Sequence, residues 1–240
     1  MREAADWAMG RWRGEFRHWH KAKSELVSEV DLGVDKRLRA ALGALDPEAG
    51  WLSEETRDGP ERLERERVWI VDPIDGTRDF VRGRPGWCVS VALVEAGRPV
   101  LGVLDAPARG EQWMAAAGQG AWRNGVRLRG SARTEWVGAR VPADTLPKAE
   151  RELVAVAKPN SIALRAALVA NDEADVLLTT AHGHEWDIAA AALIAVEAGA
   201  AVSDGRGAAL MFNQPEPKLW GFLACAPALK AAAVARAARS

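Results

Sequence analysis

The sequence predicts a layered α+β and α/β fold, with an antiparallel sheet in its N-terminal half and a mixed sheet with helices in its C-terminal half. Two apolar, β-patterned runs at 87–94 and 100–105 flank a turn, and this pattern predicts a β-hairpin. Beyond residue 150, short strand patterns alternate with longer helical ones, as in α/β proteins. The segment 131–150, rich in small, polar and proline residues, predicts a boundary between domains 1–132 and 133–240.

Two helices are expected ahead of the first sheet. The first covers residues 2–20, because apolar side chains recur there at intervals of three to five residues. These side chains are Trp7, Trp12, Phe16 and Trp19. After a loop at 21–31, Asp31 is placed to cap a second helix that runs to about Leu45.

The remaining elements are predicted from apolar runs and the turn residues between them. A short strand over 50–55 ends in two acids, and charges of alternating sign at 61–67 predict an exposed, helix-like connection. Gly118 and Gly120 predict a loop or bulge between two later strands. The other expected elements are strands at 69–71, 112–116, 126–129, 153–157, 175–179, 201–203 and 220–224, and helices at 161–170, at 185–198 and at the alanine-rich terminus.

The composition is that of an ordinary globular protein of 240 residues, with 48% hydrophobic and 27% charged residues. Because 32 basic residues face 33 acidic ones, the net charge of -1 argues against binding to nucleic acid polymers or to a membrane surface. The two cysteines, Cys88 and Cys225, lie in apolar surroundings and are expected to be buried and reduced. The first residues form no apolar leader segment, which predicts residence in the cytoplasm.

The strongest chemical signal is the run WIVDPIDGTRDF. Residues 69–71 predict a buried strand, and Asp72 and Asp75 follow where the chain leaves the sheet. Gly76 and Thr77 then supply a turn and the start of a helical turn, whose backbone N–H groups would point toward the acids. Carboxylates gather cations and exposed amides bind phosphate, so the pattern favours a functional site. The alternative is a simple acidic turn, since Asp, Pro and Gly are common turn residues.

Other polar residues are candidates for the same site. Glu54 and Glu55 end a predicted strand, and their alternative role is a pair of solvated surface acids. Asp187 falls in the first turn of a predicted helix, where capping alone would also favour an aspartate. His182 and His184 are expected in a loop at the mouth of the site, in contact with substrate or solvent. The acidic candidates offer only oxygen ligands, which favours Mg²⁺ over zinc.

These motifs together resemble the inositol monophosphatase superfamily of Mg²⁺-dependent, lithium-sensitive phosphatases. They are EE at Glu54, DPIDGT at Asp72, WDIAA at Trp186 and EAG at Glu197, and they cover most of the chain in the family's order. The resemblance implies an αβαβα sandwich, similar also to fructose-1,6-bisphosphatase. It further implies an enzyme that hydrolyses small-molecule phosphate monoesters with metal-activated water, and a homodimer.

By this resemblance, the ligands of a first Mg²⁺ would be Glu54, Asp72 and the carbonyl of Ile74. A second ion would be held by Asp72, Asp75 and Asp187, and each site would bind two or three ions. Asp72 would therefore bridge two ions. Glu54 would also act as the base that activates the attacking water.

Further residues would act around these ligands. Thr77, hydrogen-bonded to Asp31, would orient the attacking water, and the alternative role of Asp31 is a plain helix cap. The amides of Gly76 and Thr77 would bind the phosphate, and Asp75 would also contact the substrate. Glu55 would support the metal site from outside the set of ligands.

The preferred substrate is predicted from positions at which this sequence differs from the inositol phosphatases. Thr180 stands seven positions before Asp187, where those enzymes carry an acidic residue. Arg165, in place of a lysine in a phosphate-contacting loop, resembles the 3'(2'),5'-bisphosphate nucleotidases and would bind substrate. We therefore expect hydrolysis of adenosine 3',5'-bisphosphate to AMP and phosphate. The alternatives are an inositol-1-monophosphatase, a histidinol-phosphate phosphatase, and an inactive substrate-binding relative.

Overall fold

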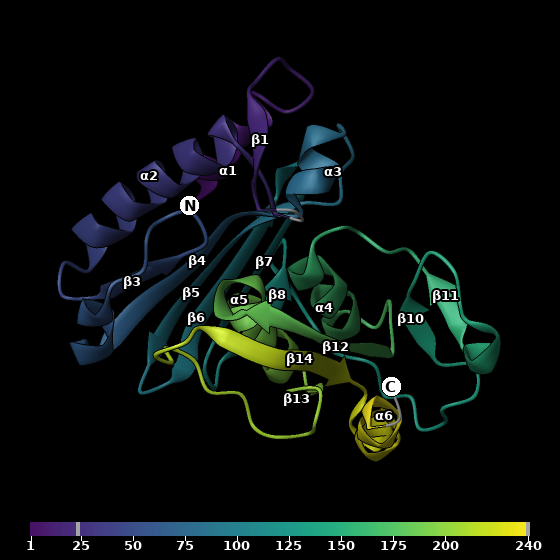
Figure 1. Cartoon of the computed structure of the whole chain (residues 1–240). Helices are drawn as coiled ribbons and strands as arrows, with labels where there is room; N and C mark the ends of the chain where they lie inside the picture. Colours follow the sequence, from purple (N-terminus) through teal and green to yellow (C-terminus); the bar gives the residue numbers. More distant parts are fainter. Residues whose placement is uncertain (23–24, 239–240) are drawn as a thin grey trace.

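A seven-stranded sheet forms the centre of the computed structural model, which describes residues 1–22 and 25–238 (Figure 1). Its strands lie in chain order from β3 to β9. The β3–β4 pair is parallel and the neighbouring pairs from β4 to β9 are antiparallel, which confirms the antiparallel sheet predicted for the N-terminal half. The strands are β3 (Gly50–Ser53), β4 (Arg67–Asp75), β5 (Cys88–Glu95), β6 (Arg98–Ala106), β7 (Glu111–Ala116), β8 (Gly120–Arg123) and β9 (Val126–Arg127).

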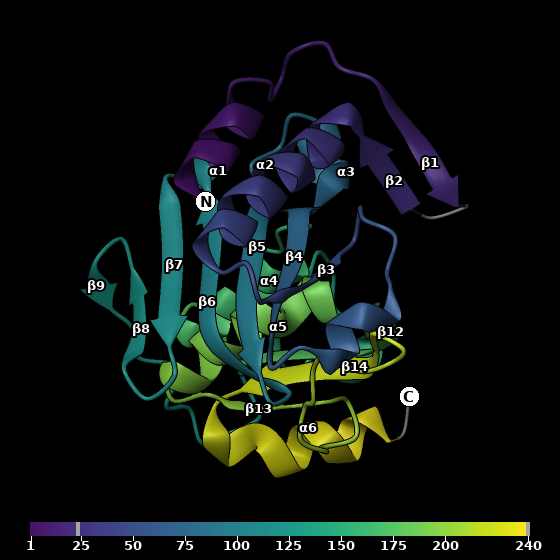
Figure 2. The ribbon, with the colours of Figure 1, turned by 90° about the vertical axis from the view of Figure 1, so that its left-hand side faces the viewer.

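Helices cover both faces of this sheet, and the apolar run on β4 explains why. Val68 and Ile70 pack into one core cluster with α4 and α5. Trp69 and Val71 pack into another cluster with α1 and α2, which Figure 2 shows over the sheet. Successive strand side chains point to opposite faces, so an unbroken apolar run indicates a strand buried on both sides. The helices are α1 (Arg2–Met9), α2 (Glu29–Leu45), α4 (Ile162–Ala170) and α5 (Glu185–Glu197).

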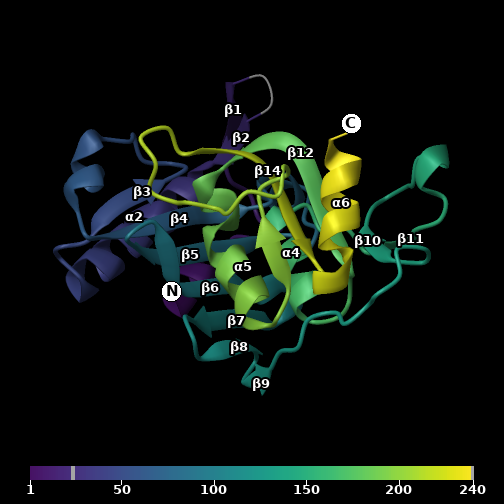
Figure 3. The same cartoon turned by 90° about the horizontal axis from the view of Figure 1, so that it is seen from below.

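A second sheet of three antiparallel strands, in the order β12-β14-β13, covers the α4–α5 layer. On β14, Phe222 and Ala224 belong to the α4–α5 core, whereas Leu223 and Cys225 pack with residues of α6. The layers therefore form the predicted αβαβα sandwich (Figures 1 and 3). These elements are β12 (Val176–His184), β13 (Ala201–Ser203), β14 (Lys218–Cys225) and α6 (Lys230–Ala237).

Smaller elements complete the fold around the two sheets. Two short pairs stand apart from the main sheets: β1 with β2 is antiparallel, and β10 with β11 is parallel. A short helix, α3 (Thr77–Val81), follows β4 directly. The other bounds are β1 (His18–Ala22), β2 (Glu25–Ser28), β10 (Arg140–Pro142) and β11 (Val154–Val156), and 3₁₀ turns at Pro60–Glu64, Pro107–Arg109, Lys148–Glu150 and Pro227–Leu229.

The helix predicted over 2–20 is wrong beyond Met9, because the chain turns at Gly10 and later enters β1. Glycine is a poor helix former. The aromatic side chains that suggested a helix instead make tertiary contacts. The ring centroids of Trp12 and Trp87 lie 6.4 Å apart, and those of Phe16 and Phe80 lie 5.2 Å apart. Packing therefore decides the path of this segment.

Two predictions for connecting segments also need correction. The loop expected at Gly118 is present as a turn over 117–119, but an unpredicted strand, β8, begins at Gly120, whose N–H donates to a Glu197 carboxylate oxygen at 2.7 Å. Arg62, within the run of alternating charge, is buried and not exposed. Its guanidinium pairs with Asp58 at 2.7 Å and donates to Asn213 Oδ1 at 2.6 Å. Within the run, Arg62 therefore has a structural role in the protein interior.

The largest core cluster joins residues of both predicted domains, among them Leu104 and Leu164. The division at residue 132 stays a prediction from composition. Cys88 and Cys225 are buried and free, as expected. Within the described residues, no helix has both the length and the apolar character needed to cross a bilayer.

Candidate active site

Strand β4 ends in a bulge that brings functional groups together. Asp72 pairs with Ser90 of β5 and Asp75 pairs with Cys88, so three steps along β4 oppose two steps along β5. A bulge of this kind locally redirects side chains and often lies beside a functional site. Asp72, Ile74 and Asp75 are all buried, and the Ile74 N–H donates to Asp72 Oδ1 at 3.0 Å.

Most of the predicted site residues line one cavity of about 190 Å³, which we call the acid pocket. Its acids come from three separate segments: the residue after β3, the end of β4 and the start of α5. Sequence reasoning did not identify Leu26, Arg78 and Asn160 as part of this lining. The lining consists of Leu26, Glu54, Asp72, Ile74, Asp75, Gly76, Thr77, Arg78, Asn160 and Asp187.

Burial and mutual repulsion raise the pKa values of these acids. Burial, with the nearby charge of Glu55, raises the pKa of Glu54 to about 8. Burial, with the charges of Glu54 and Asp75, raises the pKa of Asp72 well above its usual range. Burial raises the pKa of Asp187 to about 6. The pocket therefore concentrates negative charge that a bound cation would neutralise.

Asp75 also caps helix α4, a role that the sequence did not predict. Its Oδ2 accepts hydrogen bonds from Ser161 Oγ at 2.5 Å and from the Ala163 N–H at 2.7 Å, and Oδ1 accepts from the Ile162 N–H at 3.2 Å. Burial and the charge of Asp187 raise the pKa of Asp75 to about 7 even though these hydrogen bonds lower it. The acid pocket is therefore attached directly to the start of α4.

Gly76 allows the close approach of three segments at the pocket. Its φ of +96° lies in the left-handed region that favours glycine. A Cβ here would lie 2.7 Å from the Gly86 carbonyl oxygen and 2.9 Å from the Ser161 backbone nitrogen. Helix α3 starts at the next residue, Thr77. The glycine in the motif is thus required by both backbone conformation and space.

Asp31 occupies the third position of α2, and Ser28 is the helix cap that was predicted at Asp31. The two residues form a capping box, in which Asp31 Oδ2 accepts from the Ser28 N–H at 2.9 Å. Asp31 Oδ1 lies 3.0 Å from Thr77 Oγ1, as expected, and Thr77 Oγ1 also lies 3.0 Å from the Ile74 carbonyl oxygen. Asp31 therefore connects the start of α2 to the lining of the acid pocket.

Glu55 lies behind the pocket and pairs with a lysine. Its side chain is 1% exposed and forms an ion pair with Lys21 of β1. Burial raises the pKa of Glu55, and the hydrogen bond from Lys21 opposes this shift. Lys21 Nζ also lies 3.4 Å from the Glu54 carbonyl oxygen. Of the loop predicted at 21–31, residues 23–24 lie outside the described residues and residues 25–28 form β2.

Gly76, Thr77 and Asp75, predicted to contact the substrate, line the acid pocket, whereas the predicted contacts His184 and Arg165 do not. His184 is the last residue of strand β12, not part of a loop; its N–H donates to Asp187 Oδ2 at 2.8 Å and its ring stacks on Trp186. His182 also belongs to β12, and the structure does not describe its side chain. Arg165 of α4 donates to the carbonyl oxygens of Pro159 and Asn160 at 2.7 and 2.6 Å, and it lines a neighbouring cavity.

The donors of the acid pocket suit a hard divalent cation. Carboxylates and a carbonyl oxygen are the ligands that Mg²⁺ prefers. Among the described residues, no three His, Cys, Asp or Glu side chains already form a metal-binding group. Some of the oxygens instead accept hydrogen bonds, at Asp72, Asp75 and Asp187. The residues therefore fit Mg²⁺ by chemistry and charge.

Known proteins share both the sequence and the fold. The model of the inositol monophosphatase family matches residues 1–240. Inositol monophosphatase 2 of Solanum lycopersicum is 33% identical over 206 residues, 78% of this chain and 78% of its own. The 3'(2'),5'-bisphosphate nucleotidase CysQ of Escherichia coli K12 is 32% identical over 205 residues, 82% of this chain and 83% of its own. The solved structure of a Thermotoga maritima IMPase has a TM-score of 0.84 at 28% identity, covering 100% of this chain and 94% of that one. The chain therefore belongs to the inositol monophosphatase family and is a phosphatase.

Proposed function

We propose that this protein is a Mg²⁺-dependent phosphomonoesterase that hydrolyses adenosine 3',5'-bisphosphate to AMP and phosphate, as a 3'(2'),5'-bisphosphate nucleotidase. The observation that supports the chemistry is the shared lining of one cavity by Glu54, Asp72, Asp75 and Asp187, beside Gly76 and Thr77. The first four are oxygen donors for cations. The last two begin a helical turn whose N–H groups suit a phosphate oxygen.

The residues of the pocket would divide the work of hydrolysis. When bound, Mg²⁺ would neutralise phosphate charge and lower the pKa of bound water. Glu54 would accept the proton of the attacking water, because its carboxylate lines the same cavity as the proposed cation ligands and the Thr77 hydroxyl. Thr77, held between Asp31 and the Ile74 carbonyl, would fix the direction of that water.

The choice of ester rests on positions at which this chain differs from the inositol phosphatase pattern, and on its relatives. CysQ of Escherichia coli, named as a bisphosphate nucleotidase, covers more of the chain than the Solanum inositol monophosphatase at nearly the same identity. Thr180 of β12 lacks the carboxylate that would bind sugar hydroxyls in inositol phosphatases. Inositol-1-monophosphatase is the second candidate, because the Solanum relative is 33% identical. Binding of two or three ions, lithium inhibition, a homodimer and cytoplasmic residence stay predictions.

The test is phosphate release from three substrates: adenosine 3',5'-bisphosphate, inositol 1-phosphate and histidinol phosphate. We expect activity with Mg²⁺, none with EDTA, inhibition by lithium, and kcat/KM at least about tenfold higher for the bisphosphate. Faster cleavage of inositol 1-phosphate would reject the proposed substrate. Asp72→Asn should abolish Mg²⁺ binding and turnover together, whereas a wild-type protein inert to all three esters would indicate a substrate-binding relative.

A further inference from the structure

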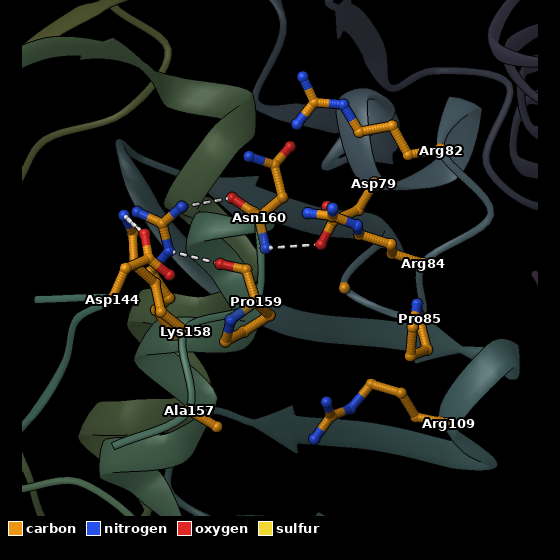
Figure 4. A pocket seen from close by; sticks show the side chains of 12 residues that line it. Asp79, Arg82, Arg84, Pro85, Arg109, Asp144, Ala157, Lys158, Pro159 and Asn160 are labelled. Atoms are coloured by element: carbon orange, nitrogen blue, oxygen red, sulfur yellow. Dashed lines mark hydrogen bonds and ion pairs between the residues drawn. The ribbon is translucent and has the colours of Figure 1, made fainter. Parts of the chain in front are cut away.

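A second cavity lies beside the acid pocket and is rich in basic side chains. Its volume is about 430 Å³. Figure 4 shows Arg82, Arg84 and Arg109 extending from one side toward Lys158 on the other. Together with Arg165, the lining contains five basic and two acidic residues, and we call it the basic pocket. Its complete lining is Asp79, Arg82, Arg84, Pro85, Gly86, Arg109, Asp144, Ala157, Lys158, Pro159, Asn160 and Arg165.

The two pockets are neighbours, because Asn160 lines both. The next residue, Ser161, donates to Asp75 in the acid pocket, and its N–H donates to the Gly86 carbonyl at 2.8 Å. The Asn160 N–H lies 3.3 Å from Asp79 Oδ2. The loop ahead of α4 is therefore held in place between the two pockets, which adjoin at Asn160.

The basic pocket holds more positive charge than its own acids balance. Arg109 forms an ion pair with Glu111 at 2.8 Å, and Lys158 forms an ion pair with Asp144 at 2.7 Å. Arg165 donates to carbonyl oxygens, and no carboxylate among the described residues forms an ion pair with it. Burial lowers the pKa of Arg165, and the nearby charges of Asp75, Asp144 and Asp79 oppose this shift. Arg82 and Arg84 are exposed at the rim.

We propose that the basic pocket binds a second phosphate-like group of the substrate, while the phosphate that is cleaved occupies the acid pocket. This inference rests on the proposed phosphatase function and deepens it, because it selects small esters that carry two such groups. Arginine guanidinium groups suit phosphate oxygens by charge and by planar hydrogen-bond geometry. Arg82 and Arg84 would bind the second group directly, and Arg165 would add positive charge from the pocket wall.

The experiment compares wild type with the double variant Arg82→Ala/Arg84→Ala on two substrates, adenosine 3',5'-bisphosphate and adenosine 3'-monophosphate. Loss of charge-assisted hydrogen bonds should lower the kcat/KM ratio of bisphosphate to monophosphate by about tenfold or more, mainly through KM. Lys36→Ala, which removes an exposed charge on α2 outside both pockets, should leave the ratio unchanged. A ratio unaltered by the double variant would overturn the inference even if both substrates are cleaved.

A binding measurement separates this inference from the proposed function. With EDTA present, inorganic sulfate should raise the melting temperature of wild type and of Lys36→Ala, and should do so much less for the double variant. This holds even if wild type cleaves neither adenosine phosphate, an outcome that would reject the nucleotidase proposal alone. Equal sulfate stabilisation of all three proteins would show that the two arginines bind no anion. A further outcome is that sulfate stabilises only wild type and Lys36→Ala, while wild type cleaves the bisphosphate and the monophosphate with equal kcat/KM. The two arginines would then bind free anions, and the proposal that they bind the second phosphate of the substrate would be rejected.

Discussion

Thr77 Oγ1 lies 3.0 Å from Asp31 Oδ1, although the two residues are 46 positions apart in the chain. Both side chains are buried, and Asp31 is fixed by the capping box at the start of α2. The same hydroxyl lies 3.0 Å from the Ile74 carbonyl, which lines the acid pocket. A single hydroxyl proton serves one acceptor at a time, so Asp31 and Ile74 compete for it. The contacts with Asp31 and with the Ile74 carbonyl together fix the position of the Thr77 hydroxyl.

Thr77→Ala should lower kcat by about 100-fold, because the residue that orients and polarises the attacking water is lost. Thr77→Ser keeps the hydroxyl and should stay within about tenfold of wild type. Steady-state kinetics with adenosine 3',5'-bisphosphate measures both, and circular dichroism confirms that each variant folds. Turnover of Thr77→Ala close to that of wild type would contradict the role assigned to this hydroxyl.

If Asp31 acts through Thr77, substitutions at the two residues should not have additive effects on the activation free energy. Asp31→Asn alone should lower kcat, and the double variant with Thr77→Ala should be little slower than either single one. Independent, multiplying losses would mean that Asp31 serves the pocket in another way, such as through the α2 cap alone.

The acid pocket predicts that the metal-free protein loses stability as the pH rises. Glu54, Asp75 and Asp187 have pKa values raised to about 8, 7 and 6 from ordinary values near 4. A carboxyl group with a raised pKa in the folded state contributes stability that is complete below the unfolded pKa and is lost as the pH rises through the folded one. Between pH 5 and pH 8, in EDTA, the free energy of unfolding should therefore fall by about 2 kcal/mol or more.

Denaturant unfolding across this pH range, with and without Mg²⁺, tests the prediction. Mg²⁺ should remove most of the loss, because a bound cation stabilises the ionised acids. Asp72→Asn, which removes one of the four charges, should show a smaller loss in EDTA and little response to Mg²⁺. A flat profile in EDTA would mean that the acids do not repel one another as the structure indicates.

Elements with continuous local patterns were predicted well, and long-range contacts explain the failures. The hairpin of β5 and β6, helix α5 and strand β13 match their predicted ranges closely, because their signals lie within the segment itself. The helix predicted beyond Met9 failed because Trp12 packs on Trp87 and Phe16 on Phe80. Gly10 and Gly14 are local signals against a helix, but the contacts that set the path of residues 10–17 are with distant residues.

For the candidate site, too, signals in the sequence motifs were read correctly and long-range contacts were missed. Motif order brought Glu54, Asp72, Asp75 and Asp187 into one set, and the structure places all of them on one cavity. Partners from distant segments were missed. Asp75 caps α4 through Ser161, 86 positions away, and Arg62 is buried against Asn213, 151 positions away. Such pairs depend on how the sheets and helices pack, which periodicity and turn signals do not describe.

Gly76→Ala should destabilise the protein by about 2 kcal/mol or more. The added Cβ would force a left-handed conformation on alanine and would lie 2.7 Å from the Gly86 carbonyl oxygen. Gly43→Ala in α2 is the matched control, because its Cβ would meet nothing within 4 Å and alanine favours helix by about 1 kcal/mol. Chemical denaturation should thus move the two variants in opposite directions, and a neutral Gly76→Ala would contradict the packing at this turn.

Asp175 predicts a stability contribution with the opposite pH dependence to that of the acid pocket. Its side chain is 1% exposed, and its oxygens accept from the Arg140 N–H at 2.7 Å, from the Arg140 guanidinium at 2.7 and 3.0 Å, and from Ser131 Oγ at 2.5 Å. Burial alone would raise the pKa of Asp175, but hydrogen bonds from Arg140 and Ser131 outweigh it and lower the pKa to about 2.

A carboxyl group with a lowered pKa contributes stability that is complete above its unfolded pKa, near 4, and is lost as the pH falls toward 2. Asp175→Asn should therefore cost about 2 kcal/mol at pH 7, and the difference from wild type should shrink as the pH is lowered from 5 toward 3. Urea unfolding at a series of pH values measures it. Glu216→Gln, at an exposed pair with Lys218, should change stability little at any pH. If Asp175→Asn is as harmless as this control at pH 7, the ion pair with Arg140 contributes nothing to folding, and the lowered pKa has no thermodynamic basis.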